Sequence, residues 1–194
     1  MKKIILASNS PRRRELLCGL GFEYEVRVLD DIDESYPETL RGSEVAAYIS
    51  RVKADAYRAT MAGDEIVITA DTIVCLDDKV LGKPADEIEA MAMLRSLSGR
   101  THQVYTGVTI VAAEGDSTFV SRSDVTFASL TDEEMLHYVK CYQPMDKAGA
   151  YGIQEWIGYV GVERIEGSYF NVMGLPVQRL YAELKKYLKK DCED

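Results

Sequence analysis

Short apolar runs and amphipathic segments alternate along this chain. Continuous apolar runs predict strands over residues 2–8 and 65–76, the second rich in β-branched residues. Apolar residues at helical spacing predict helices over 11–20 and 43–62, and Ser43 is a candidate N-cap of the second helix. This first part of the chain therefore interleaves strands with helices.

The same alternation continues to the C-terminus. Thr131 followed by Glu134 matches a capping box and predicts that a helix begins there, over 131–139. The residues 143–154 contain glycines and predict a loop. The other expected elements are a strand over 24–29, an acidic loop over 30–42, a hairpin over 76–81, a helix over 86–97, paired long strands over 101–115 and 117–130, a strand over 159–167 and a closing helix over 175–190.

This order of elements predicts an α/β fold with a mixed sheet. The 194 residues show no internal repeat and no low-complexity linker, so we expect a single domain over residues 1–194. No apolar run approaches the ~20 residues that a membrane span needs. A formal net charge of −9 disfavours binding to nucleic-acid polymers and to anionic membranes, although a small basic pocket for one anion stays compatible with it.

The cysteines indicate a reducing compartment. They stand at positions 18, 75, 141 and 192, far apart and with no CxxC pair or Cys/His cluster. Neither a zinc site nor a disulfide framework is therefore predicted. We expect free thiols and a cytoplasmic protein.

The stretch ASNSPRRREL, at 7–16, concentrates positive charge where a strand is expected to give way to a helix. The first turn of a helix presents unpaired N–H groups and attracts anions. Ser8 and Ser10 add hydroxyl donors, and Arg12 and Arg13 add forked donors that match a phosphate group. The stretch is a candidate phosphate-binding turn. The alternative is that its arginines are solvated or pair with the many carboxylates.

Asp71, in the run ADTIV, interrupts an otherwise apolar strand. A buried carboxylate without a partner is very costly, so this side chain needs a metal, a cation or a catalytic use. The alternative is an aspartate that merely begins a turn. The acidic stretch DDIDES, at 30–35, offers oxygen ligands of the kind that suit Mg²⁺ or Mn²⁺, against the alternative of a solvated charged face.

Three further polar residues are candidates. Lys83 lies in GKP at 82–84, where Gly82 permits a close backbone approach, and Lys53 lies within an expected helix among apolar residues. Taken alone, a lysine in either position is more often a solvated surface residue than part of a site. Gln154 closes DKAGAYGIQ, whose small residues leave room for a ligand, unless this stretch is only a surface loop. Together, such cations and carboxylates suit the hydrolysis of a nucleotide phosphoanhydride.

Six motifs in this order, SNSPRRREL, ADTIV, GKP, SGRTHQVYTGV, DKAGAYGIQ and GSYFNVMGLP, resemble the Maf family of nucleoside triphosphate pyrophosphatases. The resemblance runs from about residue 4 to about residue 180. It implies a two-lobed α/β fold, akin to inosine triphosphatases, with an elongated mixed sheet flanked by helices and a central cleft. It also implies conversion of a nucleoside triphosphate and water into a monophosphate and pyrophosphate, with Mg²⁺, Mn²⁺ or Co²⁺, and a homodimer.

The resemblance assigns roles residue by residue. Asp71 matches the family's general base, and with Glu34 it is the expected metal ligand. The remaining matches to the catalytic pocket are Arg13, Lys53 and Lys83, and the matches to the phosphate turn are Ser8 and Ser10.

The resemblance also favours one branch, which acts on dTTP and UTP and whose specificity positions match Arg12, Thr72 and Gln154. The branch that acts on 7-methyl-GTP has Trp and Gln at the first two of these positions. Gln154 could accept from the pyrimidine N3–H and donate to one carbonyl, while Arg12 donates to the other. Alternatives are modified nucleotides as substrates, and a non-catalytic nucleotide-binding regulator of septum formation.

Overall fold

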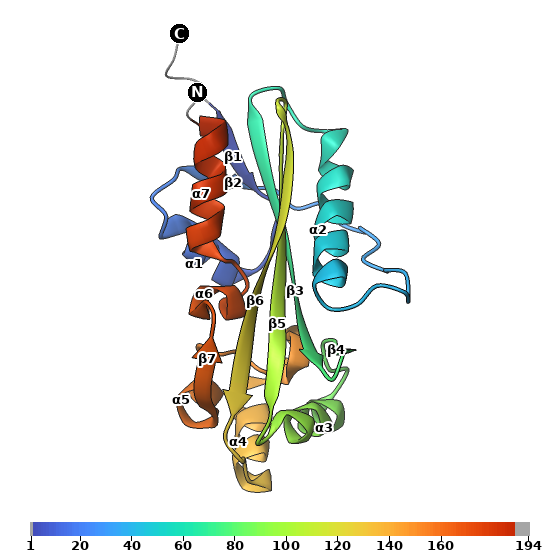
Figure 1. The fold of residues 1–194 in the computed structure, drawn as a ribbon, viewed down its shortest axis with the longest axis vertical. Helices are drawn as coiled ribbons and strands as arrows, with labels where there is room; N and C mark the ends of the chain where they lie inside the picture. Colours follow the sequence, from blue (N-terminus) through green and yellow to red (C-terminus); the bar gives the residue numbers. More distant parts are fainter. Residues whose placement is uncertain (1, 189–194) are drawn as a thin grey trace. The chain divides into compact units, whose positions relative to one another are not determined.

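The computed structural model describes residues 2–188, whose strands form a seven-stranded mixed sheet (Figure 1). The strands are β1 (Lys3–Leu6), β2 (Tyr24–Val26), β3 (Glu65–Leu76), β4 (Lys79–Leu81), β5 (Thr101–Ala112), β6 (Gly115–Phe127) and β7 (Val162–Glu166). Their order is β2-β1-β3-β5-β6-β7, with β4 paired to β3. β1 runs parallel to β2 and β3, whereas the β3–β4 and β6–β7 pairs are antiparallel. The predicted mixed α/β fold is confirmed.

Helices lie between most of these strands and after the last one, whereas β3 is followed directly by β4 and β5 by β6. The helices are α1 (Pro11–Cys18), α2 (Ser43–Arg58), α3 (Glu87–Leu97), α4 (Asp132–Tyr142), α5 (Trp156–Gly161), α6 (Tyr169–Met173) and α7 (Val177–Leu188), with 3-10 turns at Pro144–Asp146 and Ala148–Ala150. Within residues 2–188, no helix is both long and apolar enough to cross a membrane.

The described chain divides into two compact units. The first comprises the residues up to Asp71, Thr106–Ser121 and the residues from Gly174 on, and the second comprises Thr72–Tyr105 and Arg122–Met173. The expectation of a single domain over the whole chain stays a prediction, as does the central cleft.

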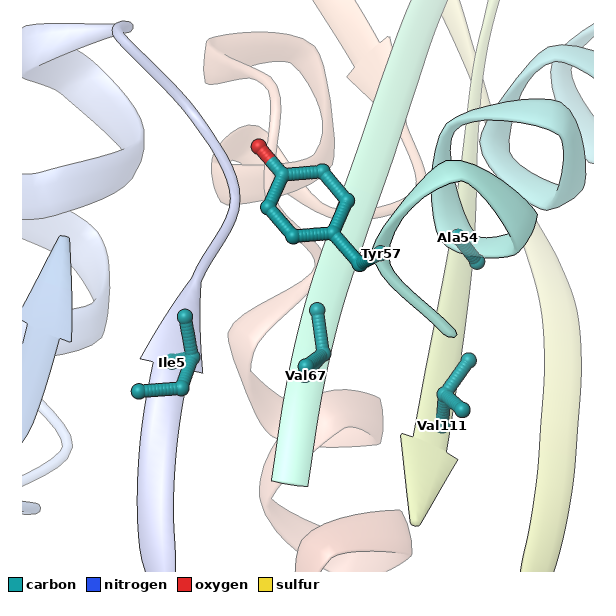
Figure 2. Packing of buried hydrophobic residues seen from close by; sticks show 5 residues of the cluster. All are labelled: Ile5, Ala54, Tyr57, Val67 and Val111. Carbon is teal, nitrogen blue, oxygen red and sulfur yellow. The ribbon is translucent and has the colours of Figure 1, made fainter. Parts of the chain in front are cut away.

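The core of the first unit lies between α2 and the sheet. Figure 2 shows five of its buried side chains, which come from β1, α2, β3 and β5: Ile5, Ala54, Tyr57, Val67 and Val111. Ile5 and Val67 are paired residues of β1 and β3. Burying such side chains supplies the main favourable free energy of folding. The packing fixes α2 on the face of the sheet that also carries Asp71.

The backbones of α2 and β5 also approach each other closely, and hydrogen bonds join α2 to the same face of the sheet. A Cβ at Gly107 would lie 2.2 Å from the carbonyl oxygen of Ala46, so only glycine lets β5 approach the helix backbone this closely. The Thr69 hydroxyl donates to the Ser50 carbonyl at 2.7 Å, and the hydroxyls of Ser50 and Thr109 are 3.0 Å apart. These bonds satisfy polar groups that would otherwise be buried at a cost.

The second unit has an aromatic core of its own. His102, Phe127 and Tyr151 contact one another edge to face. The His102 Nε2 atom lies 2.7 Å from the Tyr151 hydroxyl, and both residues are buried. The capping box predicted for Thr131 and Glu134 begins α4, as expected.

Several predicted boundaries are wrong, for local reasons. Ser43 is the first residue of α2 and not its N-cap, which is Gly42 with a φ of 46°. α2 ends at Arg58, and the Thr60 N–H and hydroxyl then donate to the Tyr57 carbonyl at 3.0 Å and 3.2 Å, which closes a turn. The strand expected over 24–29 ends at Val26, because the backbone that follows bonds to a side chain of α2 instead, as described below. The closing helix is described to Leu188, and its predicted last two residues lie outside the described residues.

The predicted loop over 143–154 contains the two 3-10 turns, and the strand expected over 159–167 begins only at Val162. The short helix α5 takes the preceding residues. Three cysteines, Cys18, Cys75 and Cys141, are free thiols as predicted, and Cys192 lies outside the described residues.

Candidate active site

The arginine-rich junction forms the N-terminus of α1. Ser10 is the N-cap, and its hydroxyl oxygen accepts a hydrogen bond from the Arg13 N–H at 3.4 Å. The Ser8 hydroxyl oxygen accepts from the Ser10 N–H at 3.2 Å. Pro11 occupies the first helical position, where its missing N–H costs nothing. Each serine hydroxyl accepts a backbone bond here and can also donate one to an anion.

Lys53 joins two of the candidate carboxylates. Its ammonium lies 2.9 Å from Asp71 Oδ1 and 3.0 Å from Glu34 Oε2. The side chains of Lys53 and Asp71 are only 14% and 12% exposed, whereas that of Glu34 is 53% exposed. Asp71 lies within β3 and begins no turn. Its burial is tolerated because the Lys53 ammonium faces it. Of the two interpretations of Asp71, a buried carboxylate with a charged partner is therefore confirmed, and an aspartate that begins a turn is wrong.

Arg13 belongs to the same charged group. Its Nε donates to the Gly174 carbonyl at 2.8 Å, which holds the side chain beside the start of α1. Burial lowers the pKa of the Arg13 guanidinium, and the Asp71 and Glu34 carboxylates oppose this by raising it. Arg13, Glu34, Lys53 and Asp71 therefore form one cluster of two cations and two carboxylates in the first unit, which we call the charged cluster.

Tyr57 anchors the segment that brings Glu34 to this cluster. Its hydroxyl accepts from the Leu29 N–H at 2.9 Å and donates to the Arg27 carbonyl at 3.0 Å. Leu29 and Ile32 also pack against the core around Tyr57, which Figure 2 shows. Tyr57 was missed at the sequence level, because a tyrosine on the apolar face of a helix reads as one more core residue.

Three of the predicted residues belong to the second unit. Thr72 follows Asp71 directly in β3 and is half-buried. Lys83 is exposed, and the carbonyl of its neighbour Gly82 accepts from the Gly149 N–H at 3.0 Å. The side-chain oxygen of Gln154 is buried and has no hydrogen-bond partner among residues 2–188. Arg12, in the first unit, is half-buried on α1.

The carboxylates suit a divalent cation only in combination with further ligands. Among the described residues, no group of three or more His, Cys, Asp or Glu side chains could hold a metal by itself. Glu34 and Asp71 nevertheless converge on a single cation, the Lys53 ammonium. One or two carboxylates completed by substrate phosphate oxygens is the usual arrangement for Mg²⁺. The residues present therefore fit a metal that arrives with a phosphorylated ligand.

The fold is similar to that of the Ham1 protein of Staphylococcus aureus, with a TM-score of 0.56 and 15% identity over 96% of this chain and 100% of that one. This likeness places the protein in the class of Ham1-like α/β folds and says nothing about its activity.

The family follows from the sequence. The Maf-like protein family model matches residues 3–187, and the chain belongs to that family. A protein of Bacteroides thetaiotaomicron is 62% identical over 95% of each chain, and one of Phocaeicola vulgatus is 61% identical over the same shares. A protein of Flavobacterium psychrophilum is 44% identical over 94% of this chain and 93% of its own. All three are named dTTP/UTP pyrophosphatase.

Proposed function

We propose that the protein is a nucleoside triphosphate pyrophosphatase that converts dTTP and UTP, and modified pyrimidine nucleotides, into the monophosphate and pyrophosphate. Such an activity removes unwanted nucleotides from the cellular pool. The observation that carries the proposal is the charged cluster, in which Lys53 bridges Glu34 and Asp71 beside Arg13. The names of relatives at 44–62% identity support the choice of substrates.

Phosphoryl transfer depends chiefly on positioning and on stabilising negative charge. In the proposal, the N–H groups at the start of α1 and the hydroxyls of Ser8 and Ser10 bind the triphosphate. Arg13, Lys53 and Lys83 offset the charge that develops on the departing pyrophosphate. Lys53 suits this role because its side chain is only 14% exposed and its ammonium already faces two carboxylates, so little water has to be removed from it when the substrate binds.

Asp71 acts as the base in this proposal. Its carboxylate takes a proton from the water whose oxygen bonds to the α-phosphorus, and the bond from that phosphorus to the bridging oxygen of pyrophosphate breaks. Glu34 and Asp71 would also hold Mg²⁺, Mn²⁺ or Co²⁺. When bound, the cation polarises the phosphate oxygens and neutralises part of their charge. The metal, the homodimer and the cytoplasmic location stay predictions.

In the proposal, the pyrimidine base is selected by Arg12, Thr72 and Gln154. The buried Gln154 oxygen lacks a partner among the described residues and would accept from N3–H of uracil or thymine. Cytosine has no N3–H and carries an amino group where uracil has a carbonyl. A buried polar group left unpaired costs about 1–3 kcal/mol, which corresponds to a preference of roughly 5- to 150-fold against CTP.

The test is pyrophosphate release by the purified protein from a panel of canonical and modified nucleotides, with each metal. Asp71→Asn is compared with Asp55→Asn, which changes an exposed carboxylate on α2 that pairs with Arg58. The proposal expects selective release from dTTP and UTP, abolished in Asp71→Asn and retained in Asp55→Asn. A kcat/KM that is highest for a purine triphosphate would overturn the proposed pyrimidine preference. No release of pyrophosphate from any nucleotide would favour a non-catalytic, nucleotide-binding regulator.

A further inference from the structure

Gln154 lies in a tight turn of the second unit that is closed at both ends. The Glu155 N–H donates to the Gly152 carbonyl at 3.0 Å, which leaves Ile153 and Gln154 as the two central residues of the turn. The Gly152 N–H donates to the hydroxyl of Tyr138 at 2.9 Å, and that hydroxyl donates to the Glu155 carboxylate. One phenol oxygen on α4 therefore ties the two ends of the turn together.

The carboxylate of Glu155 is held from its other side as well. Lys147 Nζ lies 3.2 Å from Glu155 Oε1 and 2.7 Å from Asp146 Oδ1. The Lys147 side chain is only 8% exposed, and a buried ammonium is stable only with charged partners, so this ion pair restrains Glu155. Tyr138 is fully buried, and burial together with Glu155 raises the pKa of its phenol. The raised pKa favours the protonated phenol, which is the form that donates to Glu155.

The turn also packs the Gln154 amide tightly. A Cβ at Gly152 would lie 2.9 Å from Glu155 Cδ and 3.1 Å from Gln154 Nε2, so both side chains rest against the bare Cα of Gly152. The amide nitrogen is thus placed against the turn backbone, while the amide oxygen is buried without a partner among residues 2–188. A buried acceptor without a donor is costly, unless a ligand supplies the donor.

The orientation of this amide decides which pyrimidine it can recognise. With its oxygen facing N3 and its nitrogen facing O4, a glutamine matches uracil and thymine. Rotated by half a turn, the same amide donates to N3 of cytosine and accepts from the cytosine amino group. Selection against cytosine therefore requires a glutamine that is present and also prevented from rotating.

We infer that Tyr138, Glu155 and Lys147 are positioning residues that hold the turn rigid, fix the orientation of the Gln154 amide, and so set the preference for UTP over CTP. The inference rests on the proposed function. None of the three residues need touch the substrate, because they act through the backbone and the packing of the turn.

The experiment compares two tyrosine variants of the full chain. Tyr138→Phe removes the oxygen that joins Gly152 to Glu155. Tyr151→Phe, the matched control, removes a buried phenol oxygen that bonds to His102 and is not part of the turn closure. For each we would measure kcat/KM for UTP and for CTP, together with Tm.

Both variants should lose stability, but only Tyr138→Phe should change selectivity. We expect its ratio of kcat/KM for UTP over CTP to fall by about fivefold or more, the equivalent of one lost buried pairing. The change should appear as a higher KM for UTP and a lower KM for CTP, with kcat for UTP altered less. A merely structural role of Tyr138 would lower Tm and leave the ratio at the wild-type value.

Glu155→Gln keeps the inference testable if Tyr138→Phe does not fold. It preserves the shape of the side chain and removes the charge that pairs with Lys147, so the same fall in the ratio is expected. An unchanged ratio in the folded variants, with an active wild-type protein, would overturn the positioning role and leave the proposed function intact. A wild-type protein that releases no pyrophosphate from UTP or dTTP would overturn both.

Discussion

Tyr57→Phe tests whether the Tyr57 hydroxyl holds the segment that carries Glu34 in place at the charged cluster. The substitution removes one oxygen atom from a side chain that is 2% exposed and leaves the ring in place within the core. Two backbone groups lose their partner, the Leu29 N–H at 2.9 Å and the Arg27 carbonyl at 3.0 Å. Each hydrogen bond contributes about 0.5–1.5 kcal/mol net, so the free energy of unfolding should fall by about 2 kcal/mol.

The loss of these two hydrogen bonds should also lower the catalytic activity. Glu34 lies on the segment that these two bonds restrain, and its carboxylate meets Lys53. A displacement of about 1 Å of a catalytic group can lower a rate by about a hundredfold, and we expect kcat/KM for UTP to fall by about tenfold for partial loosening. Stability would be measured by urea denaturation, and activity by pyrophosphate release below the temperature at which the variant unfolds.

Tyr48→Phe is the matched control. Tyr48 lies on the same helix, is half-buried, and makes no hydrogen bond through its hydroxyl within residues 2–188. The control should keep both stability and activity. The reasoning would be refuted if Tyr57→Phe lost less than about 0.5 kcal/mol, the lower limit for a single bond, and also kept wild-type kcat/KM.

Two further predictions concern the folding of each unit. Gly107→Ala should destabilise the protein by about 3 kcal/mol in chemical denaturation, because the new methyl group would collide with the Ala46 carbonyl, whereas Gly63→Ala, with no atom within 4 Å of the new Cβ, should change stability little. Burial lowers the pKa of His102 to about 4 from an ordinary 6.5, so its stabilising effect is complete above pH 6.5 and is lost as the pH falls towards 4. Unfolding free energies at pH 7 and pH 4.5 should differ by about 2 kcal/mol more in the wild type than in His102→Gln, and equal differences would contradict this assignment.

Local patterns predicted much of the fold. The run 65–76 became β3 with the expected bounds, because a long stretch of β-branched residues buried on both faces has few other stable conformations. The capping box at Thr131 was also readable, because its two hydrogen bonds join residues three apart. Helix α5 was missed, since its apolar residues from Tyr159 on continue directly into those of β7 and were assigned to one strand. Gly158 permits the helix, as a Cβ there would lie 1.8 Å from the Ile153 carbonyl oxygen.

Only part of the charged cluster could be predicted from the sequence. Asp71 stood out because a carboxylate inside an apolar run demands a partner, but nothing in the spacing showed that Lys53 and Glu34 would supply the contacts. Those pairs depend on α2 lying across the sheet, which is a tertiary property. Lys147 was overlooked for the same reason, because a lysine in a glycine-containing loop reads as solvated until its contact with Glu155 is seen.

In the proposed reaction, the charged cluster directs water to the α-phosphorus of a pyrimidine nucleoside triphosphate. The most direct measurement is hydrolysis of UTP by the purified protein in ¹⁸O-labelled water, with mass analysis of both products and Asp71→Asn in parallel. We expect one ¹⁸O atom in UMP, none in pyrophosphate, and no turnover by the variant. Label in pyrophosphate, release of inorganic phosphate, or turnover by Asp71→Asn close to that of the wild type would contradict it.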